Sequence, residues 1–173
     1  IITGEPGGEP GRDARACLLA WLEAEHETLK AKLEALAGKA EYGVQVSWDP
    51  QVVMRQVSQS DAQIRALEEE IKGKPPGVAY MYRQRLEALL KEKTEAVATA
   101  ECTTIYSNIA QLVGEVRVEK PKTDPGQLQM LINLSCLVSH AQLPRLKAEH
   151  DRLNGMEGFS TRLIGPLPPY SFC

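Results

Sequence analysis

The segment from Ala40 to Trp48 alternates between two kinds of residue. One set is Ala40, Tyr42, Val44, Val46 and Trp48, and the other is Glu41, Gly43, Gln45 and Ser47. Successive side chains of a β-strand point to opposite faces, so this period of two predicts a strand with one face on a hydrophobic core. A strand needs partner strands, and the helical segments of the chain must therefore be arranged around a sheet.

Two helical segments flank this strand. Asp13 is placed to cap the first helix, and Gly38 is placed to end it. The first helix carries a stripe formed by Leu18, Leu22, Leu29, Leu33 and Leu36. Asp49 and Pro50 begin the second helix. Its apolar residues resemble a short coiled-coil seam, interrupted by Ser60: Val53, Val57, Ile64, Leu67 and Ile71.

The sequence GKPPG, residues 73–77, breaks the chain before a long helix from about Val78 to Val116. This helix has two apolar stripes that are out of phase. The first is Tyr82, Leu86, Leu89 and Val97, and the second is Ile105, Ile109, Leu112 and Val116. We therefore expect the helix to bend or to change its packing partner midway. The helices on either side of the break should form an antiparallel hairpin over residues 50–117.

The C-terminal third contains two further strands. Residues 130–138 alternate and are partly apolar on both faces, which predicts a central strand. A short helix with Pro144 in its first turn follows, and then a last strand that should end near Gly165, because proline cannot donate to a sheet. The predicted order is α-β-α-α-β-α-β. The sequence thus predicts a predominantly helical α+β fold, in which a small sheet packed with helices carries an extended, coiled-coil-like hairpin.

Charge and composition argue against several partners. The formal net charge is −3, whereas a nucleic-acid-binding protein normally presents a basic face. No stretch approaches the roughly 20 apolar residues of a membrane span, and no signal peptide is visible. The chain begins with Ile1 rather than Met, so upstream residues are expected. We expect neither a nucleic-acid partner nor a membrane partner.

Chemistry-bearing residues are isolated from one another. The cysteines are scattered and are interpreted as reduced thiols, most of them buried: Cys17, Cys102, Cys136 and Cys173. The histidines have no neighbours at metal-ligand spacing: His26, His140 and His150. Cys136 lies in a predicted strand and is interpreted as a core thiol rather than a nucleophile. No phosphate-binding loop, dinucleotide-binding or serine-nucleophile motif is present. The sequence therefore predicts no catalytic residue, no metal and no cofactor.

The chain ends in GPLPPYSFC, residues 165–173. The prolines favour an extended polyproline conformation, which would hold Tyr170 and Phe172 as pre-organised anchors. We expect the tail to dock on its own domain and to bury both aromatic side chains there. The alternative interpretation is that the tail contacts a partner. Both interpretations apply if the docked tail shapes a groove that a partner occupies.

The tail resembles the C-terminal signature TGPWPPYSF of the gas-vesicle protein F/L family (GvpF/GvpL), with Ile164 and Leu167 replacing its threonine and tryptophan. Three upstream segments appear in the family's order. EYGVQVSWD (41–49) resembles EWGVKVYWD, with Tyr42 replacing a tryptophan, and PPGVAYMYRQR (75–85) resembles PGRAYLLRRR, with Val78 replacing an arginine. NLSCLV (133–138) resembles NAAYLV. The resemblance runs from about Arg12 to Phe172.

The resemblance implies a domain organisation and a role. Family members carry a ferredoxin-like domain before this region, so residues 1–11 are expected to be a linker or a remnant of that domain. Residues 12–173 would form the C-terminal α+β domain. The resemblance further implies a cytoplasmic, non-enzymatic accessory or minor structural protein of gas vesicles. Its partners would be the hydrophobic shell protein and other gas vesicle accessory proteins.

Candidate structural or interaction residues follow from these patterns. They are Tyr42, Trp48, Ile64, Tyr80, Pro168, Pro169, Tyr170 and Phe172. The alternative function is that of a coiled-coil adaptor in another cytosolic complex, since seams and strands serve any assembly.

Overall fold

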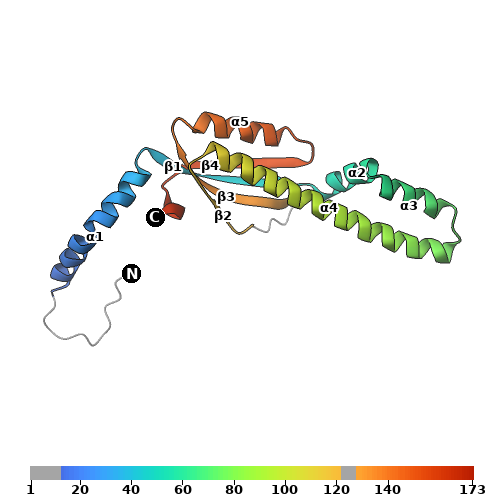
Figure 1. The fold of residues 1–173 in the computed structure, drawn as a ribbon, viewed down its shortest axis with the longest axis horizontal. Coiled ribbons are helices and arrows are strands. Elements are labelled where there is room, and N and C mark those ends of the chain that lie inside the picture. Colours follow the sequence, from blue (N-terminus) through green and yellow to red (C-terminus); the bar gives the residue numbers. More distant parts are fainter. Residues whose placement is uncertain (1–12, 122–127) are drawn as a thin grey trace. The chain divides into compact units, whose positions relative to one another are not determined.

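A computed structural model describes residues 13–121 and 128–173. Its elements are α1 (Ala14–Leu36), β1 (Lys39–Trp48), α2 (Pro50–Ser60), α3 (Ala62–Lys72), α4 (Pro76–Leu112), β2 (Glu115–Val118), β3 (Gln129–Ser139), α5 (Leu143–Asn154), β4 (Phe159–Leu167) and the 3-10 helix η1 (Tyr170–Phe172). The predicted α+β class is confirmed (Figure 1). The expected linker or domain remnant at residues 1–11 lies outside the described residues. The chain divides into two compact units, one containing α1 and one running from Gly38 to Phe172.

Helix α1 begins and ends where the sequence predicted. The Asp13 carboxylate accepts a hydrogen bond from the backbone N–H of Arg15 at 3.0 Å. Gly38 follows the helix with a φ of +70°, in the left-handed region that glycine adopts readily because it has no Cβ. No side chain of α1 is buried.

The larger unit is built on an antiparallel sheet of order β2-β3-β1-β4. Tyr42, Val44 and Val46 project from β1 into a core that also contains Ile105 of α4 and Leu146 of α5. Both helices therefore cover the same face of the sheet (Figure 1). The predicted alternation of β1 matches this arrangement, because its apolar set lies in the core.

The predicted end of the long helix near Val116 is wrong, and strand β2 was not predicted. Val116, assigned to the second helical stripe, lies in β2 and pairs with Cys136. The helix ends at Leu112, and Gly114 lies between the two elements. A strand of four residues shows too few alternations to be distinguished from a helical stripe by period alone.

The predicted helix from Asp49 to Ile71 is two helices. α2 ends at Ser60, and the Asp61 carboxylate accepts hydrogen bonds from the backbone N–H groups of Gln63 and Ile64 at 2.8 and 3.2 Å. Asp61 also pairs with Lys93 of α4 at 3.1 Å, and this partner, with the capping hydrogen bonds, lowers the pKa of Asp61. An aspartate that can bond the backbone N–H groups ahead of it favours a new helix start over a continuous helix.

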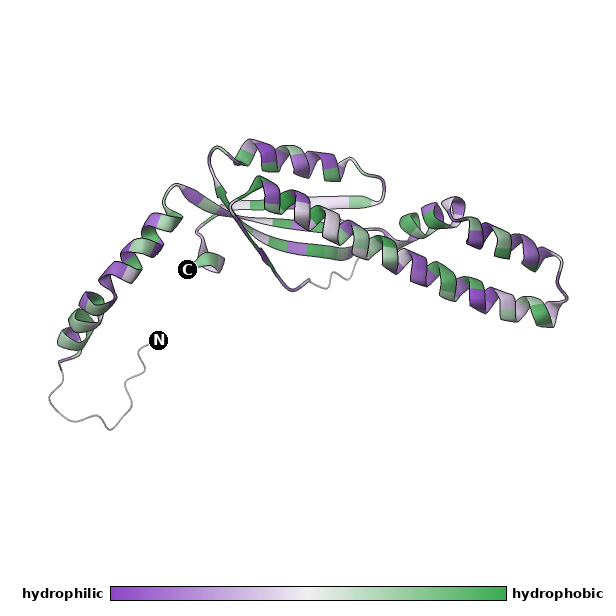
Figure 2. Ribbon diagram, viewed as in Figure 1, coloured by the Kyte–Doolittle hydropathy of each residue, from purple (hydrophilic) through white to green (hydrophobic). Residues whose placement is uncertain are grey.

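Helix α4 changes its packing partner midway, as its two stripes predicted. In its N-terminal half, Leu86, Leu89 and Val97 pack on a second cluster that includes Val57 and Ile64. In its C-terminal half, Ile105 and Ile109 enter the sheet core. Figure 2 shows the difference: the half over the sheet is mostly hydrophobic or neutral, whereas the hairpin half mixes both kinds.

Strand β4 runs past Gly165 to Leu167, so the expected strand end near Gly165 is wrong. Leu167 lies opposite Glu41 of β1. β4 is an edge strand, and an edge strand can contain Pro166 because its outer side needs no ladder hydrogen bonds.

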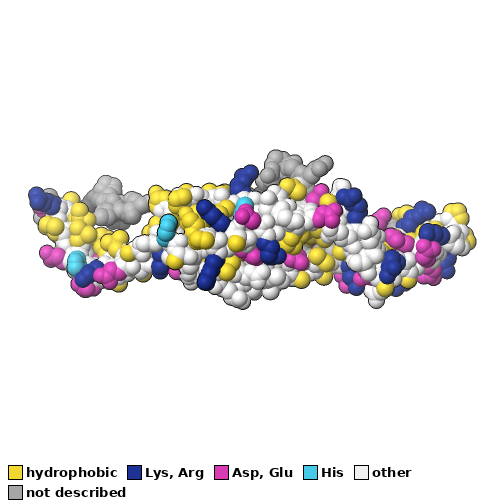
Figure 3. Space-filling model, turned by 90° about the horizontal axis from the view of Figure 1, so that it is seen from above, with side chains coloured by type: hydrophobic (Ala, Val, Ile, Leu, Met, Phe, Trp, Pro, Cys, Tyr) yellow, Lys and Arg dark blue, Asp and Glu magenta, His cyan; other side chains and the backbone are white. Residues whose placement is uncertain are grey.

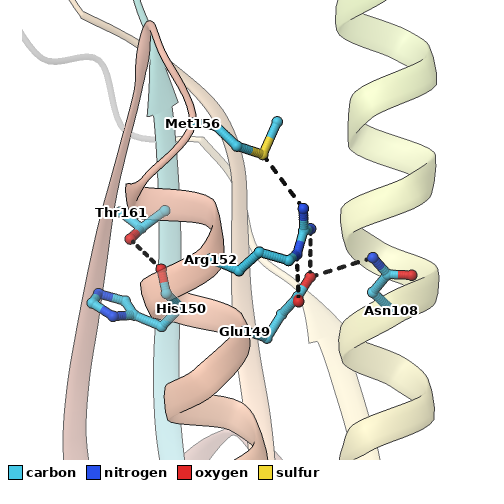
Figure 4. Close-up of polar contacts among 6 residues, drawn as sticks. All are labelled: Asn108, Glu149, His150, Arg152, Met156 and Thr161. Atoms are coloured by element: carbon cyan, nitrogen blue, oxygen red, sulfur yellow. Dashed lines mark hydrogen bonds and ion pairs between the residues drawn. The ribbon is translucent and has the colours of Figure 1, made fainter.

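A polar cluster connects α5 to α4 and to β4 (Figure 4). The Arg152 guanidinium donates to both carboxylate oxygens of Glu149, each at 2.8 Å, and the Asn108 amide of α4 donates to Glu149 at 3.3 Å. The Thr161 hydroxyl of β4 donates to the backbone carbonyl of His150 at 3.3 Å. Arg152, with a smaller contribution from Asn108, lowers the pKa of Glu149 below its ordinary value of 4.5.

Ile64→Ala should destabilise the hairpin strongly, because Ile64 is 0% exposed in the second cluster. Truncating a buried isoleucine to alanine removes apolar contacts and leaves a cavity, at a cost of about 2–5 kcal/mol. Arg65→Ala, at the exposed neighbouring position, is the control and should change the free energy of unfolding little. Denaturant unfolding measures both. Equal effects of the two substitutions would contradict the described register of α3.

Glu149→Gln should lower stability at neutral pH and lose its effect in acid. Because the folded-state pKa of Glu149 is below its unfolded value, the carboxylate stabilises the fold above pH 4.5, and this contribution disappears as the pH falls through the folded-state pKa. Thermal unfolding of both proteins between pH 3 and pH 7 would check this. Melting curves whose separation does not shrink toward low pH would show that the Glu149 carboxylate does not contribute.

Candidate interaction site

The C-terminal tail docks on its own sheet. η1 lies on the side of the sheet opposite α5 (Figure 1). There, the Ser171 backbone N–H donates to one carboxylate oxygen of Glu41 at 2.8 Å, and the Ser171 hydroxyl donates to the other at 2.7 Å. The Ser171 hydroxyl also lies 3.4 Å from that of Ser135 on β3. A single serine thus joins the chain terminus to the two central strands.

This contact explains how a carboxylate can lie inside the fold. Glu41 is 6% exposed and Ser135 is 7% exposed. A buried carboxylate is costly unless hydrogen bonds replace its lost hydration. Ser171 supplies two donors to Glu41, and hydrogen bonds to a charged acceptor are stronger than those between neutral groups. The docked tail therefore offsets part of the cost of burying Glu41.

The two aromatic side chains of the tail differ in burial. Phe172 is half-buried, and the Arg117 guanidinium of β2 lies 5.0 Å from its ring centroid, within cation–π range. Tyr170 is 78% exposed. The expectation that both rings would be buried is therefore wrong for Tyr170. Hydrogen bonds from Tyr170 N–H to the Pro168 carbonyl and from Phe172 N–H to the Pro169 carbonyl turn the chain at this point, so that Ser171 and Phe172 face the sheet.

Gly165 allows the tail to approach β1 closely. Its φ of +142° is rarely adopted by residues with a Cβ. A Cβ at this position would lie 2.8 Å from Cδ1 of Tyr42 and 2.9 Å from the carbonyl oxygen of Glu41. The chain therefore requires glycine where β4 passes into the tail.

The other predicted residues fall into two groups. Tyr42, Trp48 and Ile64 are 8%, 5% and 0% exposed. Tyr42 belongs to the sheet core, and Trp48 and Ile64 belong to the second cluster. Tyr80 is 60% exposed and lies beside exposed Val78 and Met81, in the first turns of α4. We call Val78, Tyr80 and Met81 the apolar tip. Figure 3 shows hydrophobic side chains at this end of the hairpin. Pro168 is exposed and Pro169 is half-buried.

Sequence reasoning missed Glu41, Ser135 and Ser171 as a unit. The alternation of β1 places Glu41 on the outward face of the strand and does not indicate that its side chain is buried. All three lie in segments that resemble the gas-vesicle family's motifs, which was the available signal. Nothing local in the sequence pairs Glu41 with Ser171, because 130 positions separate them.

Two of the described cysteines have thiols with raised pKa values. Burial raises the pKa of the Cys136 thiol to about 12, with a smaller contribution from Glu41, so this cysteine is a poor nucleophile. Burial also raises the pKa of Cys102. Among residues 13–121 and 128–173, no group of three or more His, Cys, Asp or Glu side chains is placed to hold a metal ion. No helix in these ranges is long and apolar enough to cross a membrane.

Ser171→Ala should destabilise the larger unit by about 1.5–3 kcal/mol, because it removes a hydrogen bond to a buried carboxylate. Tyr170→Ala, one residue away but exposed, is the matched control and should leave the melting temperature nearly unchanged. Thermal and denaturant unfolding measure both. If Tyr170→Ala were the more damaging substitution, the tail would dock through Tyr170 and the described contact would be wrong.

Comparison with known proteins identifies relatives along nearly the whole chain. The family model described as gas vesicle synthesis protein GvpL/GvpF matches residues 12–173. Gas vesicle protein F of a Streptomyces species is 30% identical over 167 residues, covering 96% of this chain and 66% of that protein. Gas vesicle protein L of Haloferax mediterranei is 23% identical over 158 residues, covering 88% of this chain and 49% of that protein.

Solved structures share the fold. The gas vesicle protein GvpF of an Anabaena species aligns with a TM-score of 0.64 at 16% identity, covering 90% of this chain and 62% of that one. GvpF of Microcystis aeruginosa aligns with a TM-score of 0.54 at 18% identity, covering 88% of this chain and 62% of that one. The chain thus spans about half to two thirds of the length of these relatives. The resemblance inferred from the four sequence segments is confirmed, and the chain belongs to the gas vesicle synthesis protein GvpL/GvpF family.

Proposed function

We propose that this chain takes part in gas vesicle assembly as a non-enzymatic accessory or minor structural protein that binds the hydrophobic shell protein. The observation that carries the gas vesicle role is the family match across residues 12–173. Its partners would be the shell protein and other gas vesicle accessory proteins, and its location would be the cytoplasm and the gas vesicle.

We further propose that the apolar tip is the surface that contacts the shell protein. Val78, Tyr80 and Met81 are 42%, 60% and 69% exposed at the start of α4. Val78 and Met81 are three residues apart and therefore lie on one helix face. Exposed apolar side chains that are gathered in one place suit contact with a hydrophobic partner.

Contacts within the hairpin favour an ordered surface at the apolar tip. Ala79 lies between the exposed residues and is only 4% exposed. Close by in the chain, the Lys74 ammonium lies 5.2 Å from the centroid of the Tyr82 ring, and the Gln84 amide donates to the Tyr80 hydroxyl at 2.8 Å. These contacts order side chains around the tip before a partner arrives, which lowers the entropy lost on binding.

A non-enzymatic role agrees with the chemistry of the described residues. The sheet face opposite the helices is occupied by the chain's own tail around Glu41 and Ser171. Its most buried thiol, Cys136, has a pKa raised to about 12. An assembly protein needs surfaces and a stable frame, and these are what the fold supplies.

Val78→Ser/Met81→Ser should weaken binding of the shell protein by tenfold or more without lowering the melting temperature. Fully burying an exposed side chain of this size contributes about 1.5–3 kcal/mol, of which these partly exposed side chains together retain more than about 1.4 kcal/mol, the amount that corresponds to tenfold in Kd. Pulldown and a binding titration with purified shell protein provide the measurement. Tyr170→Ser, which removes an exposed aromatic side chain outside the tip, is the control.

Two outcomes would count against the proposal. Unchanged binding by the double variant would exclude the apolar tip as the contact surface. No capture of the shell protein by the unaltered protein, in any state of shell assembly, would contradict shell-protein binding itself.

A further inference from the structure

Helix α1 carries an apolar seam, and none of the helix's own residues is buried. Leu19, Leu22, His26, Leu29, Leu33 and Leu36 follow one another at spacings of three and four, which are the a and d positions of a heptad repeat. Leu19 is 50% exposed and Leu33 is 70% exposed. An isolated helix is marginal in water unless an apolar face is packed, and none of the 23 residues of α1 is buried.

The surface along this seam has the form that a partner helix requires. A shallow hollow is lined by Leu19, Leu22, Glu23, His26 and Glu27. The first four of these residues stand at consecutive a, d, e and a positions. A side chain of a facing helix inserts into a hole formed by four such residues.

The charges beside the seam fit a second copy in reverse orientation. Glu23 and Lys30 occupy the e positions, and Glu25 and Lys32 occupy the g positions. In an antiparallel pair that aligns Leu22 with Leu33 of the other copy, Glu25 faces Lys32 and Glu23 faces Lys30. Each flanking glutamate then meets a lysine. In a parallel pair only Glu25 meets a lysine, Lys30, while Glu23 faces Leu18.

The single polar residue of the seam favours the same orientation. In a parallel pair, His26 would face His26 of the other copy in one layer of the interface. In the antiparallel alignment each His26 packs against Leu29 instead. A lone polar residue at an a position commonly fixes the register and orientation of a coiled coil, and the opposed helix dipoles add to this preference.

We propose that α1 pairs with α1 of a second copy of this chain as an antiparallel two-stranded coiled coil. The occupant is a second copy because the charge pattern of α1 is complementary to its own reverse. This inference is independent of the proposed function, since it concerns neither the apolar tip nor the shell protein.

Sedimentation velocity of the protein over a concentration series tests the pairing. The unaltered protein should show a concentration-dependent dimer. Leu33→Glu, in the seam, should shift the dimer Kd at least tenfold toward monomer. Ala31→Glu, on the opposite side of the same helix, adds the same charge and should leave the dimer intact. Circular dichroism and the melting curve confirm that each variant retains its folded larger unit.

A charge exchange tests the orientation. Glu25→Lys alone places a lysine against Lys32 in the antiparallel pair and should weaken the dimer about tenfold at low salt. Glu25→Lys/Lys32→Glu should restore it, because the pair is re-formed with its signs exchanged. In a parallel pair the same double variant would leave the introduced lysine against Lys30, and the dimer would stay weak.

Each remaining outcome overturns the proposal. A protein that stays monomeric throughout the concentration series has no such pairing. A dimer that tolerates Leu33→Glu assembles through another surface. If Glu25→Lys/Lys32→Glu does not restore the dimer affinity lost in Glu25→Lys, the helices do not pair in the antiparallel orientation. If the protein stays monomeric but binds a helix of another protein through Leu33, the seam is an interface with that protein.

Discussion

Strand β1 is hydrogen-bonded on both of its edges, and most of the larger unit depends on that position. It pairs with β3 on one side and with β4 on the other. Tyr42, Val44 and Val46 supply one core, and Trp48 supplies the second cluster. Its next residue, Asp49, caps α2 through the backbone N–H of Gln51 at 2.9 Å. A register shift of one residue in β1 would move every one of these side chains to the wrong face.

The same alternation that builds the core places Glu41 on the opposite face. A carboxylate beside a small sheet would ordinarily remain in water, but the tail covers this one and Ser171 replaces the lost hydration. Docking of the tail therefore depends on correct formation of the sheet, since Glu41 and Ser135 lie side by side only when β1 and β3 are paired. Helix α4 couples the second cluster to this sheet, because its Ile105 end and its Leu86 end belong to different cores.

How much of this could be predicted depended on whether the determining interaction was local. Period and caps located β1, β3, α1 and α5, since each has several repeats of its own pattern. The change of partner along α4 was likewise visible as two stripes out of phase.

The break at Asp61 was obscured because the apolar spacing continues across it from Val57 to Ile64. β2 and the extension of β4 through Pro166 depend on pairing with distant strands. The contact between Glu41 and Ser171 has no local signature, so the burial of this carboxylate could not be predicted from periodicity, although both residues lie in segments that resemble the family.

The segments that resemble the family differ in what the fold requires of them. EYGVQVSWD forms most of β1, NLSCLV forms the centre of β3, and GPLPPYSF supplies Gly165 and Ser171, so burial and close packing account for most of their residues. PPGVAYMYRQR is different. Its prolines begin α4 and Ala79 is buried, but Tyr80 and Met81 face water at 60% and 69% exposure. The Tyr80 hydroxyl contacts only Gln84 within its own helix among the hydrogen bonds described. Burial in the fold therefore does not account for Tyr80 and Met81 in this segment, whereas the contact proposed for the apolar tip would.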